Sequence, residues 1–341
     1  MFRNLFVYAG IFLLLFCFAS GCSSTQNDVD LNSSVIKGHT FFKKGTKLFL
    51  FGYADSVDLF LDNLSAIDTS LVDENGDYYF SHKLSLNTVY ELQTKDSVLV
   101  PILYLSPGKE VIFNITSSNQ APVFNTSTLE GKYNDYFMKL IDTFYKEPEA
   151  KQFYYISSNF LEIEQFDDYI TKRRDRQLTF YENYFGSENV DSNFKKFAHN
   201  QILYQFGIDK MYWVIKKRMK GMKLKIDASY HDFLRTSYIQ NDNAINCPAY
   251  IRFIKFYLKD SYERKVEKDI SINKLPVHIP AVEKYKIATK NFKGLALKAA
   301  LYNIISDDIY GIGNNEIYKE VSLKSFDKIL LIFRQKYSIT D

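Results

Sequence analysis

Cysteine is scarce in this 341-residue chain, which contains only Cys17, Cys22 and Cys247. No Cys-x-x-Cys pair occurs in the sequence, and this excludes a dithiol redox motif and a cysteine-rich zinc site. Cys17 and Cys22 lie in the N-terminal leader described below, so the body of the protein has one cysteine and no internal disulfide. Cys247 precedes Pro248, which is expected to open a helix. A helix start can activate an exposed thiol, but the expected role of Cys247 is that of a small buried apolar residue.

Motifs of common catalytic and cofactor sites are also missing. The sequence has no His-Glu-x-x-His pair, no Gly-x-Ser-x-Gly elbow and no phosphate-binding Gly-x-x-x-x-Gly-Lys loop. Neighbouring carboxylates such as Asp167-Asp168 and Asp307-Asp308 are expected to be solvated rather than to flank a glycosidic bond. The sequence therefore indicates no catalytic residue, no metal ligand and no cofactor.

Neither sign of charge is in large excess. The chain has 43 Lys and Arg against 40 Asp and Glu, and the net charge of +3 excludes, by bulk charge, a strongly basic nucleic-acid binder. A hydrophobic content of 46% with 24% charged residues is typical of a folded protein. The 29 Phe and 26 Tyr predict a core rich in aromatic rings.

The first 21 residues have the organisation of a secretory signal peptide. Arg3 supplies one positive charge, and an apolar run follows at residues 5–18. These 14 residues are fewer than the ~20 needed to span a bilayer, so a removed signal is expected rather than a permanent anchor.

Ala19-Ser20-Gly21-Cys22 at the end of this segment resembles a bacterial lipobox, although Ala19 stands where Leu is commoner. The resemblance implies cleavage before Cys22 and thioether lipidation of its sulfur, and several acyl chains would anchor the protein in a membrane. Residues 22–34 then form a polar tether. The alternative is a plain signal peptide cleaved nearby, with Cys22 unmodified.

Residues 35–131 have the patterns of short strands. Apolar and polar residues alternate at 57–62 and 111–115, and residues 48–51 and 98–105 are nearly continuous apolar runs. About seven strands at this spacing predict an antiparallel β-sandwich or a partly open barrel.

Turn residues separate these strands. Asn75-Gly76 lies between apolar segments at 67–72 and 78–80 and predicts a β-hairpin. Residues 106–109 (SPGK) separate two further strands in the same manner.

From residue 132 the apolar residues recur with a helical period. Asp191 or Ser192 is expected to cap a helix that runs towards Lys220 and ends before Gly221. Six to eight helices are predicted over residues 132–341, so the fold class is α+β: the β-sandwich or barrel, followed by an all-helical domain. The expected apolar faces are Tyr133, Phe137, Leu140, Ile141 and Phe144; Tyr250, Ile251, Ile254, Tyr257 and Leu258; and Phe326, Ile329, Leu330, Phe333 and Tyr337.

A group of cations marks the expected end of the helix that precedes Gly221. Cations complement the helix dipole at a C-terminus, and each is worth about 1 kcal/mol beside an anionic lipid surface. Two interpretations stay open: contact with anionic headgroups, and a solvated helix end. The cations are Lys216, Lys217, Arg218, Lys220, Lys223 and Lys225.

Three short motifs follow the lipobox in order: residues 35–39 (VIKGH), 73–80 (DENGDYYF) and 105–111 (LSPGKEV). The arrangement resembles the N-terminal DUF4369-like domain of lipoproteins from Bacteroidota, with its "I-x-G" first strand, "G-x-F" hairpin and "L-x-P-G" turn. Residues 128–131 (TLEG) resemble that family's exit into a helical linker, and the resemblance covers about residues 35–145.

The resemblance implies a cell-envelope location and a β-plus-helical scaffold. Family members commonly continue into a C-terminal thioredoxin-like domain, whose Cys-x-x-Cys performs thiol–disulfide exchange. Exchange needs an attacking thiolate and a resolving partner, which this sequence lacks, so the enzymatic activity is not implied.

These observations predict a lipid-anchored cell-envelope protein that acts as a non-catalytic binding or accessory module. The expected partners are the membrane, through lipidated Cys22, and an unidentified protein or glycan, with no nucleic acid. The tether lacks a dense acidic run, which favours the periplasm-facing side of the outer membrane over surface display. Two alternatives stay open: a fragment or partner of a thioredoxin-type thiol–disulfide oxidoreductase system, and a surface glycan-binding lipoprotein.

Overall fold

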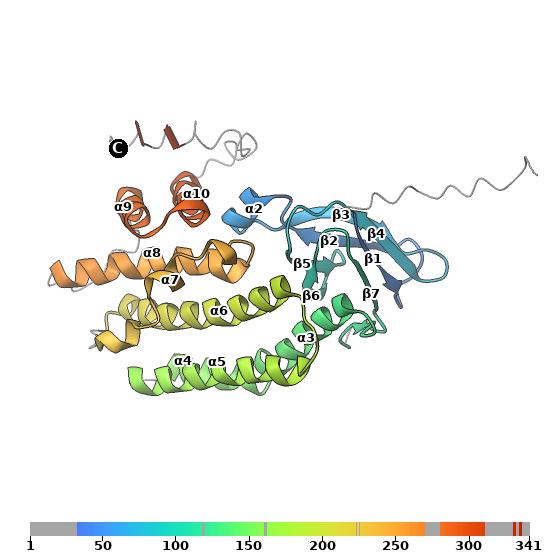
Figure 1. Cartoon of the computed structure of the whole chain (residues 1–341), viewed down its shortest axis with the longest axis horizontal. Coiled ribbons are helices and arrows are strands. Elements are labelled where there is room, and N and C mark those ends of the chain that lie inside the picture. The colour runs from blue at the N-terminus through green and yellow to red at the C-terminus, as the bar shows by residue number, and fades with distance from the viewer. Residues whose placement is uncertain are drawn as a thin grey trace, which may run out of the picture.

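Strands precede helices along the chain, and the predicted α+β class is confirmed (Figure 1). The computed structural model describes residues 33–117, 120–159, 162–222, 224, 226–269, 280–310, 330–331 and 334–335. The leader with Cys22, the cations Lys223 and Lys225, and most of the apolar face expected at 326–337 lie outside the described residues.

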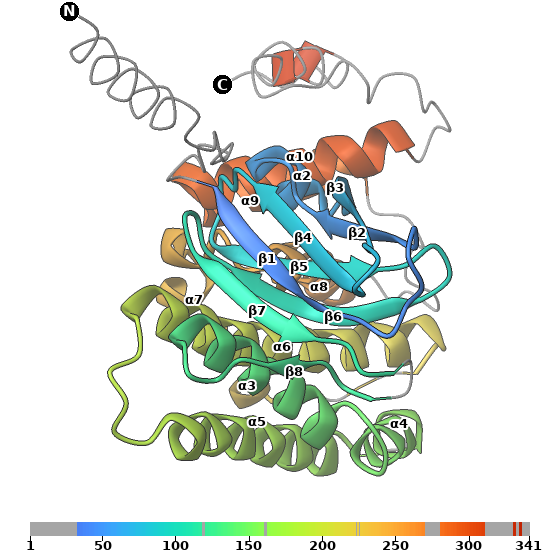
Figure 2. The ribbon, with the colours of Figure 1, turned by 90° about the vertical axis from the view of Figure 1, so that its right-hand side faces the viewer.

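Two four-stranded sheets enclose one apolar core (Figure 2). Their strand orders are β4-β1-β7-β8 and β3-β2-β5-β6. All ladders are antiparallel except the one between β1 and β7, which is parallel and which the sequence pattern does not indicate. The strands are β1 (Ser34–His39), β2 (Lys47–Gly52), β3 (Ser65–Leu71), β4 (Asp77–His82), β5 (Thr88–Gln93), β6 (Val98–Leu105), β7 (Glu110–Asn114) and β8 (Val123–Phe124).

The turn at Asn75-Gly76 forms, but the hairpin predicted around it is wrong. Gly76 has φ 86°, and the carboxylate of Asp73 accepts the backbone N–H groups of Asn75 and Asp77, each at 2.8 Å. However, β3 pairs with β2 and β4 pairs with β1, so this turn carries the chain from one sheet to the other. The turn between β6 and β7 does the same, because those strands also belong to different sheets.

Residues 57–62, predicted as a strand, form most of a short helix, α2 (Ser56–Leu61). Asp55 caps it by accepting the N–H groups of Val57 and Asp58, and the Asp58 carboxylate in turn accepts the N–H of Ala54. This reciprocal arrangement resembles a capping box and satisfies donors that the first turn leaves unpaired. The buried side chains of α2 pack against the helices of the second half: Val57, Leu59 and Phe60.

The described residues of the second half form α3 to α10, and residues 330–331 and 334–335 are also helical, so the predicted helical region is confirmed. Asp191 caps α6, Gly221 follows its end with φ 76°, and Pro248 opens α8, all as expected. None of the described helices is both long and apolar enough to cross a membrane. The α-helices are α3 (Leu129–Phe144), α4 (Glu149–Asn159), α5 (Ile163–Phe185), α6 (Ser192–Met219), α7 (Thr236–Ile239), α8 (Pro248–Asp269), α9 (Ala281–Asn291) and α10 (Gly294–Tyr310), with 3-10 turns η1 (Ala228–His231) and η2 (Asp242–Ala244).

The sheets and the helices are joined by buried contacts on two sides (Figure 1). On one side α3 lies along the edge strand β6, where the fully buried amide of Asn134 accepts the Tyr104 N–H at 2.7 Å and donates to the Tyr104 carbonyl at 3.0 Å. These bonds pair the backbone N–H and carbonyl of Tyr104, which the edge strand would otherwise leave without a partner. On the other side α2 packs on α10, where the Asn303 amide donates to the Phe60 carbonyl at 2.8 Å.

Aromatic rings fill the junction between the two halves, which confirms the expected aromatic core. Phe194 of α6 is fully buried and stacks on Tyr133 of α3, with ring centroids 3.8 Å apart. Tyr104 of β6 meets the Phe194 ring in an edge-type contact, with centroids 5.1 Å apart. A strand and two helices therefore share one set of packed rings.

Candidate functional site

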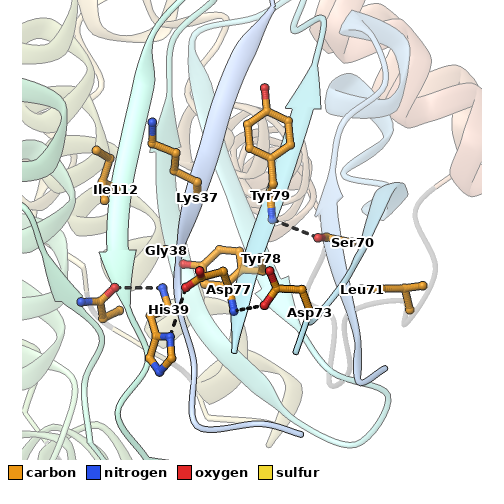
Figure 3. Close-up of a pocket in the computed structure, with 11 residues that line it drawn as sticks. Lys37, Gly38, His39, Ser70, Leu71, Asp73, Asp77, Tyr78, Tyr79 and Ile112 are labelled. Carbon is orange, nitrogen blue, oxygen red and sulfur yellow. Dashed lines mark hydrogen bonds and ion pairs between the residues drawn. The ribbon is translucent and has the colours of Figure 1, made fainter. Parts of the chain in front are cut away.

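A groove of about 580 Å³ lies on the outer face of the sheet formed by β4, β1 and β7 (Figure 3). Successive side chains of a strand point to opposite faces, so Lys37 and His39 of β1 both face outward. The ladder register places Lys37 between Tyr79 of β4 and Ile112 of β7, and it places His39 beside Asp77 of β4. The groove is therefore lined by two rows of cross-strand neighbours.

Gly38 allows the strands under this groove to approach closely. A Cβ at this position would lie 1.6 Å from the backbone oxygen of Phe113 in β7. The Tyr78 hydroxyl donates to the same oxygen at 2.8 Å, and burial raises the pKa of Tyr78 well above its usual value, which keeps the hydroxyl protonated. Any side chain at residue 38 would displace this contact.

The polar groups of the groove are held by neighbours on adjoining strands. Nδ1 of the His39 ring lies 3.1 Å from Oδ1 of Asp77. The backbone N–H of His39 donates to the side-chain oxygen of Asn114 at 2.9 Å. Lys37 Nζ lies 2.7 Å from a carboxylate oxygen of Glu110. The groove thus offers donors and acceptors in fixed positions.

The groove contains a histidine held beside a carboxylate, but no described hydroxyl or thiol is hydrogen-bonded to that ring. A histidine oriented by a carboxylate can act as a general base, but nucleophilic catalysis also needs a hydroxyl or thiol within about 2.6–3.2 Å. Among the described residues, the His39 ring has no hydrogen-bond partner other than Asp77. No group of three His, Cys, Asp or Glu in the described part of the chain is placed to hold a metal ion. The exposed side chains of Tyr79 and Leu71 supply apolar contact area at the rim.

Two of the six cations at the end of α6 are not on the surface. Arg218 and Lys217 are each only 5% exposed. The Arg218 guanidinium lies 3.5 Å from the Asp260 carboxylate and 3.6 Å from that of Glu263, both on α8. Lys217 Nζ lies 5.3 Å from the centre of the Trp213 ring. Because so little of either residue is exposed, these two cations contribute little to any lipid-facing surface.

Of the four remaining cations, two lie among the described residues and two do not. Lys220 is exposed and Lys216 is half-buried, while Lys223 and Lys225 lie outside the described residues. The backbone N–H of Lys220 closes the last turn of α6. Within the described part of the chain, contact with anionic headgroups is therefore a proposal for Lys216 and Lys220 alone.

Glu263 in this buried ion cluster gives a pH prediction. Burial raises the pKa of Glu263 from 4.5 to about 7, against the opposing effect of Arg218. Between these two values the folded state binds more protons than the unfolded state, so the free energy of unfolding falls as pH rises through this window. We expect the urea midpoint of the wild-type protein to fall between about pH 4.5 and 7 relative to that of Glu263→Gln. Parallel pH profiles for the two proteins would contradict the assignment.

Cys247 is buried at the start of α8, as expected. It is 1% exposed, its thiol lies 3.1 Å from the Gln201 side-chain oxygen, and burial raises its pKa to about 12. The thiolate is the reactive form, so this thiol does not supply exchange chemistry to the thioredoxin-related alternative.

We expect Cys247 to react with a disulfide reagent about a hundredfold more slowly in the native protein than in urea. The measurement uses the mature chain with Cys22→Ser, so that Cys247 is its single thiol. Tyr155→Cys, placed where the native side chain is 67% exposed, serves as the control and should react rapidly without urea. Equal rates at residues 155 and 247 would show that the site opens readily.

The sequence patterns do not single out the groove. Residues that point to the same face of a strand recur at every second position. In the sequence this spacing relates Lys37 to His39 in β1, and Asp77 to Tyr79 in β4. That signal is enough to place each pair on an outward face. It does not show that β1 lies between β4 and β7, which is what brings the pairs together.

Comparison of the chain with protein-family models, with curated proteins and with solved structures gives no match. The resemblance to the DUF4369-like domain therefore stays a prediction from short motifs. In the structure these motifs occupy β1, the turn between β3 and β4, and the turn between β6 and β7.

Proposed function

We propose that the chain is a lipid-anchored cell-envelope protein that binds a protein or glycan ligand without catalysing a reaction. The observation that carries the binding role is the groove on β4, β1 and β7, which combines exposed Tyr79 with fixed charged groups. Among the described residues, no hydroxyl or thiol forms a hydrogen bond with its His39 ring. The lipobox at Cys22 supports the anchor and, with the polar tether, a position on the periplasm-facing side of the outer membrane.

Metabolic labelling with an alkyne fatty acid tests the anchor. The wild-type protein is expected to carry the label and to sediment with outer membranes. Cys22→Ala should lose the label, whereas Cys247→Ala, the matched removal of a thiol that stays buried, should keep it. Label retained by Cys22→Ala would refute lipidation at this residue, and digestion of the wild-type protein by protease added to intact cells would place it on the outer surface.

Photo-cross-linking in intact cells tests the groove. A benzophenone amino acid at position 79 is expected to give a discrete adduct, because the native side chain is 49% exposed within the groove. The control carries the same probe at position 155 of α4, outside the groove, where the native side chain is 67% exposed. Adducts of equal yield at both positions, or none at position 79, would refute a ligand site in the groove.

A further inference from the structure

A second cavity, of about 110 Å³, lies where the sheets meet the helices. Its walls come from the residue before β5, the end of β6 and the first turns of α6, and from η2 and the segment that joins it to α8. On α6 the lining residues are Asn193, Lys196, Phe197 and Asn200, whose spacing of three and four places them on one face of the helix.

Asparagine dominates this cavity. Five of its nine lining residues are Asn87, Asn193, Asn200, Asn243 and Asn246. Across the described ranges, no residue forms a hydrogen bond with any of these five side-chain amides. Each amide carries two N–H donors and an oxygen that accepts two hydrogen bonds. A small space is therefore surrounded by polar groups that the protein itself leaves to water or to a ligand.

The backbone that carries these amides is well fixed. The Thr88 hydroxyl donates to the Asn246 carbonyl at 2.8 Å, which ties β5 to the entry of α8. Asp191 caps the turn that carries Asn193, and the rings of Tyr104 and Phe197 pack with centroids 5.0 Å apart behind the polar lining. A site held in this manner loses little conformational entropy when a ligand binds.

The lining selects for a ligand rich in hydroxyl groups. Lys196 is the one charged residue in it, so a phosphate or another strongly anionic group would lack cations to pair with. A hydroxyl both donates and accepts, and adjacent hydroxyls on a ring match the paired N–H and oxygen of an amide. The volume is smaller than a whole hexose and well below the ~300 Å³ at which pockets for drug-sized ligands begin. It therefore admits one edge of a sugar ring, with the rest of the ring in solvent, and not an extended peptide.

We propose that this cavity binds a single sugar residue, either free or at the end of a glycan. The five amides hydrogen-bond its hydroxyl groups, and Lys196 pairs with the carboxylate when the sugar is acidic. This site is separate from the groove on β4, β1 and β7, and it requires neither that groove nor the lipid anchor.

Saturation-transfer NMR and calorimetry on the full mature protein, in a detergent without a sugar headgroup, test the proposal. The probes are D-glucose, D-galactose, N-acetyl-D-glucosamine and D-galacturonate. We expect at least one to bind, and Asn200→Ala combined with Asn246→Ala to weaken its binding about tenfold or more, since each lost hydrogen bond contributes to affinity. Lys196→Gln should weaken galacturonate selectively and leave neutral sugars unchanged.

Asn183→Ala, which removes the same side chain from an exposed position on α5, is the matched control and should bind as the wild type does. Asn243→Ala provides a second, exposed test position if the double variant does not fold. No binding of any of the four sugars, or equal binding by the wild type and by Asn243→Ala and the double variant, would overturn the proposal. Selective binding of peptides instead would do so as well. Sugar binding without an adduct at residue 79 would refute the groove alone.

Discussion

At pH 8, above the pKa of about 7 that burial gives Glu263, replacing Arg218 with alanine is expected to lower the free energy of unfolding by about 3–5 kcal/mol. The guanidinium lies between two carboxylates on α8, Asp260 and Glu263, whose side chains are 0% and 3% exposed. Without Arg218, Asp260 keeps its contact with Arg264 at 2.8 Å, but Glu263 loses the cation that offsets its burial. An uncompensated buried charge is costly because water cannot reach it.

Urea denaturation of Arg218→Ala beside Lys220→Ala measures this effect. Lys220 is exposed at the end of the same helix, so its substitution is expected to change stability by about 0.5 kcal/mol or less. A loss below about 1 kcal/mol for Arg218→Ala would mean that the α8 carboxyl groups are neutral or hydrated in the folded protein. The comparison also separates a buried cation that stabilises the fold from an exposed cation on the same helix end.

Phe194→Ala is expected to cost about 3–5 kcal/mol, because the surrounding rings cannot close over the space left by a buried phenyl group. Besides Tyr133 and Tyr104, Phe194 touches Phe185 and Phe137, with centroids 5.6 and 5.7 Å away. These neighbours come from β6, α3 and α5, and each is fixed by its own packing. Loss of Phe194 therefore weakens the sheet–helix junction from both sides.

Chemical denaturation followed by far-UV circular dichroism and by tyrosine absorbance measures this cost. The wild-type protein should unfold in one transition by both probes, since the rings join strands to helices. Phe41→Ala removes a ring that is 45% exposed and is the matched control, with an expected loss well below that of Phe194→Ala. Equal losses in the two variants would show that the junction is not a tightly packed core.

Local signals in the sequence were sufficient for many elements of the fold. Asp191, Gly221 and Pro248 mark helix boundaries through chemistry that acts within a few residues, and the structure places the boundaries there. The apolar face of α8 is likewise visible at its helical spacing and is buried throughout. Such features depend on the neighbouring sequence and little on the rest of the chain.

The α2 segment shows where local pattern was misleading. Val57, Leu59 and Leu61 alternate as in a strand, but six residues are too few to distinguish a period of 2 from one of 3.6. The deciding signal was the pair Asp55 and Asp58, which has the spacing of a helix cap. A capping pair deserves more weight than alternation in a segment this short.

The groove, the ion cluster and the amide-lined cavity depend on contacts between distant parts of the chain. Arg218 is turned inward because Asp260 lies 42 residues further on, and nothing near Arg218 in sequence reveals this. His39 and Asp77 adjoin only because β1 pairs with β4. Periodicity states which side of an element is apolar, but it does not state which other element covers that side.

The packing of α2 on α10 sets an order on the protein's biogenesis. The hydrogen bond between Asn303 and Phe60 joins residues that are 243 positions apart. The chain emerging from the ribosome therefore presents the buried side chains of α2 long before α10 exists to cover them. Contacts this distant in sequence form slowly, and the exposed apolar surface favours aggregation meanwhile. The first half of the protein therefore stays prone to aggregation until α10, its last described long helix, has been synthesised.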